Sequence, residues 1–325
     1  MKIVVSILVH ENIDVINDQI RNFLHFNKDA LIVLHFSKRL AFDDLLNSFI
    51  KNDRVYINPV HLETKWGDLL QPHVENFKFA ASILEFDYFV MHSSNDMYFR
   101  FGSNEYISIF DAGFNLHFLL QEKSWWWPNE FAWKDNQLHK IMLNLGLSVR
   151  VASQVEGSFY KFDIFKQIID VIDKYINFNY DYGPKRYPRE EVYFSTIAQK
   201  FVNFDHISRP FVFSEVHCFD RIYWKSIENL NKLKNSFLGK IFPEFLYKKL
   251  KNRYFRHAWR DPHSRCSIDM LKKLLESDDE FINKFRYLND GVISFELYDK
   301  NNLFAIKRVP RVMTHPLRLY INSLM

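Results

Sequence analysis

The amino-acid sequence predicts an α/β protein with a doubly wound, mostly parallel sheet, followed by a helical and basic C-terminal region. Three observations predict this class. Apolar runs rich in Val, Ile and Leu recur through the first hundred residues. These runs show no alternation of polar and apolar residues, as expected of parallel strands that are buried on both faces. Stretches with helical spacing separate the runs, which is the alternation of strand and helix that builds a parallel sheet.

The first elements follow this alternation closely. Lys2 to His10 is a continuous apolar run and is predicted to be the first strand. Ile13 to Phe26 carries apolar residues at helical spacing, and Asn12 is a suitable N-cap for that helix. Ala30 to Phe36 repeats the strand pattern. The sequence then predicts a helix at Phe42–Ile50, a strand at Arg54–Pro59, a helix at Asp68–Leu84 and a strand at Phe86–His92.

After Phe99 the pattern is less regular. A strand that runs into a helix is predicted over Phe159–Ile172, a helix over Arg189–Phe201, and a strand near Val292–Leu297. The tryptophans at 125–127 lie in a predicted loop, where they would either hold the face of a sugar or a base or fill the core. We expect two domains, residues 1–215 and residues 216–325, with the second completing the ligand site.

Composition bounds the class of protein. The chain has 325 residues, of which 47% are hydrophobic, enough for a sizeable core. Cys218 and Cys266 are its two cysteines, so we expect no disulfide framework and a reducing compartment. The apolar run at the N-terminus is too short to span a membrane and lacks a cleavage site for a signal peptide. These features predict a soluble, cytoplasmic protein.

Positive charge is concentrated in one stretch. Between Arg221 and Arg260 there are eleven Lys or Arg and two Glu, although the whole chain carries a net charge of only +4. Such a stretch can contact nucleic acid, anionic lipid or a ligand that bears phosphate, or it can be a solvated helix face.

The polar residues that end the predicted strands indicate where a ligand would bind. In a parallel sheet ligands bind beyond the carboxyl ends of the strands, which here carry His10-Glu11, His35 to Ser37, and Ser93 to Asp96. The chain has no glycine-rich phosphate loop and no zinc motif. It also has no Asp-x-Asp pair to hold a metal ion on a diphosphate. If a diphosphate leaves during the reaction, Lys or Arg must stabilise its charge.

Six short segments occur in the order typical of one enzyme family. They are Ile7–Ser37, the Trp66-Gly67 turn before a helix, the strand and loop leading to Asp96, Gly157-Ser158-Phe159-Tyr160, Pro188–Gln199, and Phe281–Arg286. Together they resemble the core-2/I-branching β-1,6-N-acetylglucosaminyltransferase group, glycosyltransferase family 14, which includes peptide xylosyltransferases. Ser37 stands where the family has Asp, and Met97 follows Asp96 where the family often has Pro.

The resemblance implies a GT-A-like fold and a role for each matching residue. Glu191 would be the catalytic base, with Glu190 beside it. Lys284 would bind the donor diphosphate together with Arg260, for which Arg256 and Arg265 are competitors. No metal ion or other cofactor would be required. The implied donor and acceptor contacts are His10, His35, Ser37, Trp66, Gly67, Asp96, Gly157, Ser158, Tyr160 and Glu190.

Without the resemblance, several of these residues have a simpler interpretation. Glu190 and Glu191 would be charges that stabilise a first helical turn. Lys284 and Arg260 would be surface cations, Asp96 would cap a turn, and the two histidines would lie in the core. The interpretation as an enzyme therefore depends on the combination of residues.

The function that we expect is inverting, metal-independent transfer of a sugar. The sugar, N-acetylglucosamine or xylose-like, would pass from a nucleotide diphosphate donor, UDP-linked in this family, to a glycan or lipid-linked glycan acceptor. The resemblance implies a bacterial member that builds surface polysaccharide or lipopolysaccharide, with the basic stretch a candidate for peripheral contact with the inner membrane. Two alternatives stay open: a non-catalytic relative that binds glycan or nucleotide, and a protein that binds nucleic acid through the basic stretch, although we expect no nucleic-acid partner.

Overall fold

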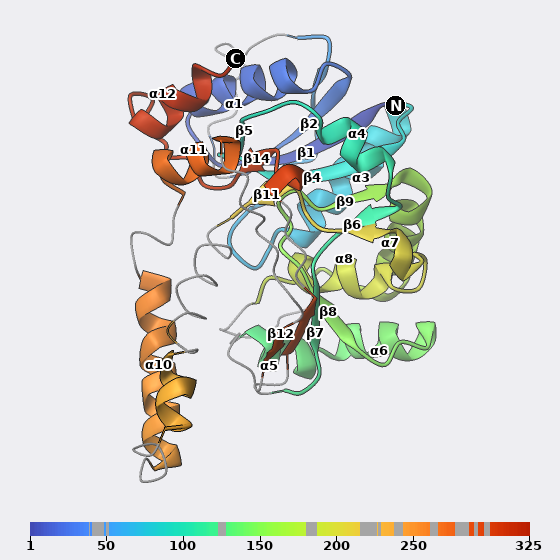
Figure 1. Ribbon diagram of the computed structural model, residues 1–325. Helices are drawn as coiled ribbons and strands as arrows, with labels where there is room; N and C mark the ends of the chain where they lie inside the picture. The colour runs from blue at the N-terminus through green and yellow to red at the C-terminus, as the bar shows by residue number, and fades with distance from the viewer. Residues whose placement is uncertain are drawn as a thin grey trace.

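The protein folds around a large, mostly parallel sheet with helices on both of its faces (Figure 1). The computed structural model describes residues 1–38, 40, 49, 52–122, 128–179, 187–214, 226, 229–236, 243–260, 266–276, 286–288, 292–295 and 300–325.

Four parallel strands form one half of this sheet. They are β1 (Ile3–Val9), β2 (Ala30–Phe36), β3 (Val55–Ile57) and β4 (Tyr88–Ser93), in the spatial order β3-β2-β1-β4. Every residue of β1 is buried, which is why its sequence is apolar on both faces of the strand. All four strands match runs predicted from sequence, and β2 has the predicted bounds.

The other half of the sheet contains a reversed strand. β9 (Phe159–Lys161) runs antiparallel to β4 and to β6 (Ala112–Gly113), and β10 (Ile207–Ser208) pairs in parallel with β6. The full order is β10-β6-β9-β4-β1-β2-β3. The expectation of a mostly parallel sheet is confirmed, with β9 as its reversed strand.

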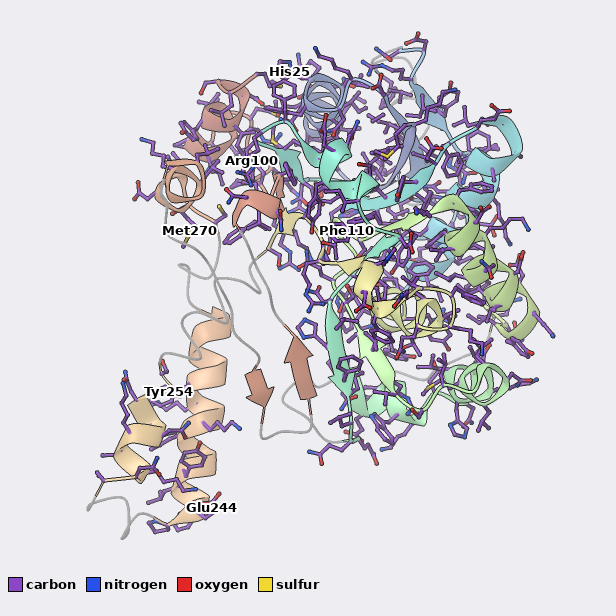
Figure 2. All side chains as sticks on the ribbon, turned by 45° about the vertical axis from the view of Figure 1, so that its right-hand side comes forward. His25, Arg100, Phe110, Glu244, Tyr254 and Met270 are labelled. Carbon is purple, nitrogen blue, oxygen red and sulfur yellow. The ribbon has the colours of Figure 1, made fainter. Side chains whose placement is uncertain are left out.

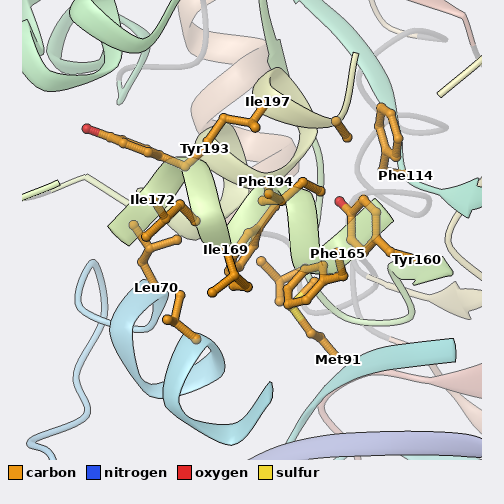
Figure 3. Close-up of a cluster of buried hydrophobic side chains, with 14 of the residues drawn as sticks. Leu70, Met91, Phe114, Tyr160, Phe165, Ile169, Ile172, Tyr193, Phe194 and Ile197 are labelled. Atoms are coloured by element: carbon orange, nitrogen blue, oxygen red, sulfur yellow. The ribbon is translucent and has the colours of Figure 1, made fainter. Parts of the chain in front are cut away.

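Helices cover both faces of the sheet. α1 (Ile13–Phe26) begins after Asn12, whose side chain accepts a hydrogen bond from the backbone N–H of Val15 at 3.0 Å, as predicted for an N-cap. It packs with one face of β1 and β2, while α3 (Leu70–Ile83), α7 (Phe162–Tyr175) and α8 (Glu190–Ala198) share the core on the other face. Figure 3 shows part of that second core, where Leu70, Phe165 and Phe194 lie together.

Two smaller sheets pair segments that lie far apart in the sequence. β5 (Met97–Tyr98), β14 (Ala305–Ile306) and β11 (Val212–Phe213) form one of them, in the order β11-β14-β5. The second is antiparallel and contains β7 (Leu116–Leu119), β8 (Arg150–Ala152), β12 (Arg286–Leu288) and β13 (Val292–Phe295), the last close to a predicted strand.

The remaining elements complete the chain. They are α4 (Ser103–Ser108), α5 (Pro128–Lys134), α6 (Asn136–Leu145), the 3-10 helices η1 (Phe204–His206) and η4 (Lys300–Asn302), α10 (Glu244–Arg260), α11 (Ile268–Glu276) and α12 (Pro316–Asn322). α12 is held to α1 by the buried ion pair between Arg318 and Asp18. None of the helices in the described part of the chain is long and apolar enough to cross a membrane.

Several sequence predictions meet the structure only in part. Apart from residue 49, the helix predicted over 42–50 lies outside the described residues, as do the tryptophans at 125–127 and Cys218. The predicted helices at 68–84 and 189–201 are α3 and α8, with narrower bounds. The domain division after residue 215 stays a prediction, and β14, from the second part, pairs with β5 and β11 of the first.

Candidate active site

Polar side chains meet where β1 and β4 end. His10 and Glu11 follow β1, and Ser94 follows β4. The Ser94 hydroxyl lies 3.4 Å from the ring nitrogens of His10 and donates a hydrogen bond to Glu11 at 3.3 Å. Glu11 is buried and forms an ion pair with Arg311, whereas His10 is exposed. The two strand ends therefore form one polar edge, as their parallel pairing requires.

Asp96 closes the turn after β4. Its Oδ2 accepts a hydrogen bond from the backbone N–H of Ser93 at 2.9 Å and lies 3.1 Å from Nδ1 of His92. Nε2 of His92 is 3.1 Å from the Tyr98 hydroxyl, so the carboxylate, the imidazole and the phenol form a buried chain. Burial raises the pKa of Asp96. Because Asp96 is fully buried, these contacts support a role in shaping the turn more than a contact with ligand.

Glu156 joins the end of β4 to the segment that follows β14. It accepts a hydrogen bond from the Ser93 hydroxyl at 2.7 Å and lies 2.9 Å from the Lys307 ammonium. Burial alone would raise the pKa of Glu156, but the charge of Lys307 and the Ser93 hydrogen bond outweigh burial and lower it to about 2. Glu156 is therefore an ionised anchor that holds a cation at the sheet edge.

Glu190 and Glu191 begin α8, beside this anchor. Hydrogen bonds tie α8 to β8: the Ser195 hydroxyl donates to the Val151 carbonyl at 2.7 Å, and the Thr196 hydroxyl accepts from the Val151 N–H at 3.0 Å. The backbone of Glu191 is fixed as well, because its carbonyl accepts from Ser153 N at 2.7 Å. The two glutamates thus stand on a rigid support.

The two glutamates share an electrostatic environment that favours their neutral form. Glu190 is buried, and burial raises its pKa to about 7. Glu191 is half-buried, and its pKa is raised to about 8, first by desolvation and then by the charges of Glu190 and Glu156. Lys307 and Arg308 oppose that rise. A carboxyl group whose pKa lies near the working pH suits general base catalysis.

The cations at this edge come from the segment after β14. Lys307 and Arg308 follow that strand directly, and Arg308 has a φ of 61°, the left-handed region that residues other than glycine rarely adopt. The backbone on both sides of Arg308 is held by hydrogen bonds: Lys307 N donates to the Phe213 carbonyl at 2.8 Å, and Val309 N donates to the Asn95 carbonyl at 3.0 Å. Such a conformation costs about 1–3 kcal/mol and tends to occur at functional sites.

Sequence reasoning missed these two cations. Their signal is present as the run Lys307 to Arg311, which holds three basic residues directly after the short apolar stretch 303–306. A two-residue strand is too short to be predicted by periodicity, so the run could not be placed beside β4.

The predicted residues His35 and Ser37 hold a loop. The His35 Nε2 accepts a hydrogen bond from the Leu62 N–H at 3.0 Å, and the Ser37 hydroxyl accepts from the Thr64 N–H at 3.1 Å. Burial lowers the pKa of His35 to about 4, so the ring is neutral at physiological pH. Both side chains are buried, and they position the loop that leads to Trp66.

Trp66 and Gly67 follow in that loop. Trp66 is 53% exposed, and Gly67 has a φ of 84°. The loop leads into α3, and the backbone of Leu69 at its end is near enough to Glu190 to oppose the rise of the glutamate's pKa. The turn predicted for the donor site therefore lies close to the start of α8.

The predicted Gly157, Ser158 and Tyr160 serve the fold. Gly157 has a φ of 76°, and a Cβ at this position would lie 2.5 Å from Cγ2 of Val212. The Ser158 hydroxyl donates to the Gln154 carbonyl at 2.6 Å. Tyr160 is buried in the core, where its ring stacks on Phe114 with centroids 5.8 Å apart (Figure 3).

The cations predicted from sequence cannot be placed in this cluster. Lys284 and Arg265 lie outside the described residues. Arg260 and Arg256 belong to α10, and the structure describes their backbone alone. Among the residues that the structure does describe, no group of three or more His, Cys, Asp or Glu is placed to hold a metal ion.

Comparison with known proteins adds little to this geometry. No family model and no curated protein matches the chain. A search of solved structures found the crystal structure of S. aureus TarS, with 11% sequence identity and a TM-score of 0.35. The match covers 85% of this chain and 46% of that chain, so this chain spans less than half of the TarS structure. At this TM-score the similarity carries no argument about fold or activity.

Proposed function

We propose that this chain is a glycosyltransferase, with Glu191 as the catalytic base. The observation that carries the proposal is the half-buried Glu191 carboxyl with its raised pKa, held on a rigid helix start beside the cations Lys307 and Arg308. The central sheet, parallel apart from β9, is compatible with a GT-A fold. A base and paired cations at the carboxyl edge of such a sheet suit displacement of a nucleotide diphosphate.

The reaction that suits these groups is a single displacement with inversion. Glu191 would take the proton of an acceptor hydroxyl while the oxygen attacks the anomeric carbon. The diphosphate leaves from the opposite face and gains charge, which Lys307 and Arg308 would stabilise without a metal ion. Lys284 and Arg260, assigned to the diphosphate by resemblance, stay predictions.

The identity of the substrates rests on the resemblance to glycosyltransferase family 14. It implies a UDP-linked N-acetylglucosamine or xylose-like donor and a glycan or lipid-linked glycan acceptor. Synthesis of a bacterial surface polysaccharide or lipopolysaccharide in the cytoplasm is the corresponding cellular role. Trp66 stands in this proposal as a donor contact, because it is exposed in a loop that reaches the start of α8.

A screen of nucleotide sugars for thermal stabilisation, followed by a transfer and donor-hydrolysis assay, tests the proposal. A ligand present at a hundredfold its Kd stabilises a protein by about 2.7 kcal/mol, which is readily detected. We expect one nucleotide sugar to stabilise the protein and to be consumed. Stabilisation without turnover would indicate a binding protein. If no nucleotide sugar in the screen stabilises the protein, the proposal is contradicted.

Arg308→Gly is the informative variant for the cation. Glycine adopts a φ of 61° without strain, so the fold should be retained while the guanidinium is lost. Loss of a group that stabilises transition-state charge typically costs about 100-fold in rate. Lys200→Gln, which removes an exposed cation after α8, is the control and should transfer sugar at the wild-type rate.

A further inference from the structure

The basic stretch forms a helical hairpin that projects from the α/β body. Residues 229–234 are helical and pack against α10, and both Figure 1 and Figure 2 show this pair standing away from the central sheet. The Tyr247 hydroxyl donates to the Asn231 side chain at 2.7 Å, and Lys234 pairs with Glu244 at 3.0 Å. The two helices therefore support each other and leave their outer surfaces to solvent.

The outer surface of the hairpin combines cations with exposed apolar side chains. Phe245, Lys249 and Arg253 are four residues apart along α10 and so share one face of the helix. Phe245 is 67% exposed, and Lys249 and Arg253 are exposed as well. On the shorter helix Leu233 is 43% exposed, between the exposed Lys232 and Lys234. We call this row of Phe245, Lys249 and Arg253, together with the exposed Leu233 of the neighbouring helix, the hairpin face.

We propose that the hairpin face docks the protein on an anionic phospholipid bilayer. Cations near such a surface are attracted by its negative potential, and exposed apolar side chains gain by entering the boundary between headgroups and acyl chains. The eleven Lys or Arg against two Glu between Arg221 and Arg260 supply the complementary charge. A nucleic acid would match the cations but not Leu233, which has no ring to stack on a base. The bilayer is therefore the partner that accounts for both kinds of side chain.

The proposal is tested with the full chain and phospholipid vesicles. Binding is measured by co-sedimentation with phosphatidylcholine vesicles that contain or lack phosphatidylglycerol, at rising salt concentration. We expect binding only when phosphatidylglycerol is present, and weaker binding as salt rises. Each cation near an anionic surface contributes roughly fivefold in affinity, so Lys249→Glu/Arg253→Glu should weaken binding at least about 25-fold. Phe245→Ser, which leaves the charge unchanged, should also weaken binding.

A matched control changes charge elsewhere. Lys166→Glu/Lys174→Glu alters the net charge equally on the exposed side of α7 and should bind vesicles nearly as wild type does. Equal loss in this control, or no dependence on phosphatidylglycerol, would overturn the proposal. The proposal would also be overturned if Phe245→Ser bound vesicles as tightly as the unmodified protein does and the unmodified protein bound duplex DNA tightly in a salt-sensitive manner. Because vesicle binding needs no sugar donor, and donor hydrolysis is assayed in solution, this proposal and the proposed function can fail independently.

Discussion

The pH dependence of sugar transfer is the sharpest test of the role of Glu191. A pKa of about 8 means that about one molecule in eleven carries an ionised Glu191 at pH 7, and about ten in eleven at pH 9. If the ionised form is the base, kcat/KM rises about tenfold between these two values. Glu191→Gln removes the base and should lower kcat/KM by roughly 100- to 10,000-fold. The residual rate should lose this dependence on pH.

The assay is transfer or donor hydrolysis measured across the pH range, with Glu190→Gln as the matched control. Glu190 is the neighbouring carboxyl on the same helical turn, and its charge raises the pKa of Glu191. Glu190→Gln should therefore keep the rise of activity with pH but move it to lower pH. If Glu191→Gln transfers sugar at the wild-type rate, or keeps the same rise with pH, Glu191 is not the base.

Stability measurements separate loss of the base from loss of the fold. The unfolded chain releases the Glu191 proton near 4.5, whereas the folded protein keeps it until about pH 8. Raising the pH between these values therefore lowers the free energy of unfolding. Glutamine does not ionise, so Glu191→Gln should be more stable than wild type at pH 8, by at least about 1 kcal/mol. Denaturant unfolding of both proteins at pH 5 and pH 8 checks this.

Three further predictions concern metal, charge and backbone. Activity should survive excess EDTA, and a loss of activity that Mn²⁺ restores would contradict the metal-free proposal. Glu156→Gln should lower the free energy of unfolding at pH 7, because it removes the carboxylate that lies 2.9 Å from the Lys307 ammonium. Since the pKa of Glu156 is lowered to about 2, the stabilising contribution of this carboxylate is lost as the pH falls from about 4.5 toward 2. The difference in free energy of unfolding between Glu156→Gln and wild type should therefore vanish near pH 2, which acid unfolding curves would measure. Gly157→Ala should destabilise the protein by more than Gly146→Ala. Gly146 has a similar φ of 69° but no atom within 4 Å of an added Cβ, so its substitution should cost only about 1–2 kcal/mol of backbone strain. Equal losses of stability in urea unfolding would refute the steric argument.

The central sheet could be predicted from sequence because its pattern is local. β1 and β2 are apolar on both faces and are separated by a helix of regular spacing, so Ala30–Phe36 and Ile13–Phe26 have the predicted bounds. Strands of two residues, such as β5 and β14, have no period to detect. Their place is decided by pairing with each other and with β11, which only the tertiary structure reveals.

The positions of some candidate residues could be predicted from strand ends and a helix start. His10 and Asp96 follow predicted strands, Glu191 stands in the first turn of a predicted helix, and the structure puts the first two at the same edge of the sheet. The role of Glu191 as base was implied by the resemblance alone and stays a prediction. The position of Lys307 and Arg308 could not be predicted from sequence. The preceding strand, β14, is two residues long, and its pairing with β5 and β11 brings the two cations to that edge. Tyr160 belongs to the predicted motif Gly157-Ser158-Phe159-Tyr160. It stands on strand β9, however, and its side chain is part of the hydrophobic core.

The three carboxyl groups of the cluster differ in pKa for reasons that suit a site for an anionic donor. Glu156 stays ionised because Lys307 and Ser93 compensate its burial, and in this form it orients the ammonium. Glu190 and Glu191 lack comparable compensation, so near pH 7 burial holds Glu191 largely neutral and keeps a substantial share of Glu190 neutral as well. Three ionised carboxylates together would repel a diphosphate, whereas one that is already paired with a cation repels it little. Separated pKa values within one cluster allow an ionised anchor and a general base to act side by side. The same burial that keeps Glu191 from repelling the donor makes its carboxylate, once ionised, a stronger proton acceptor than an exposed glutamate.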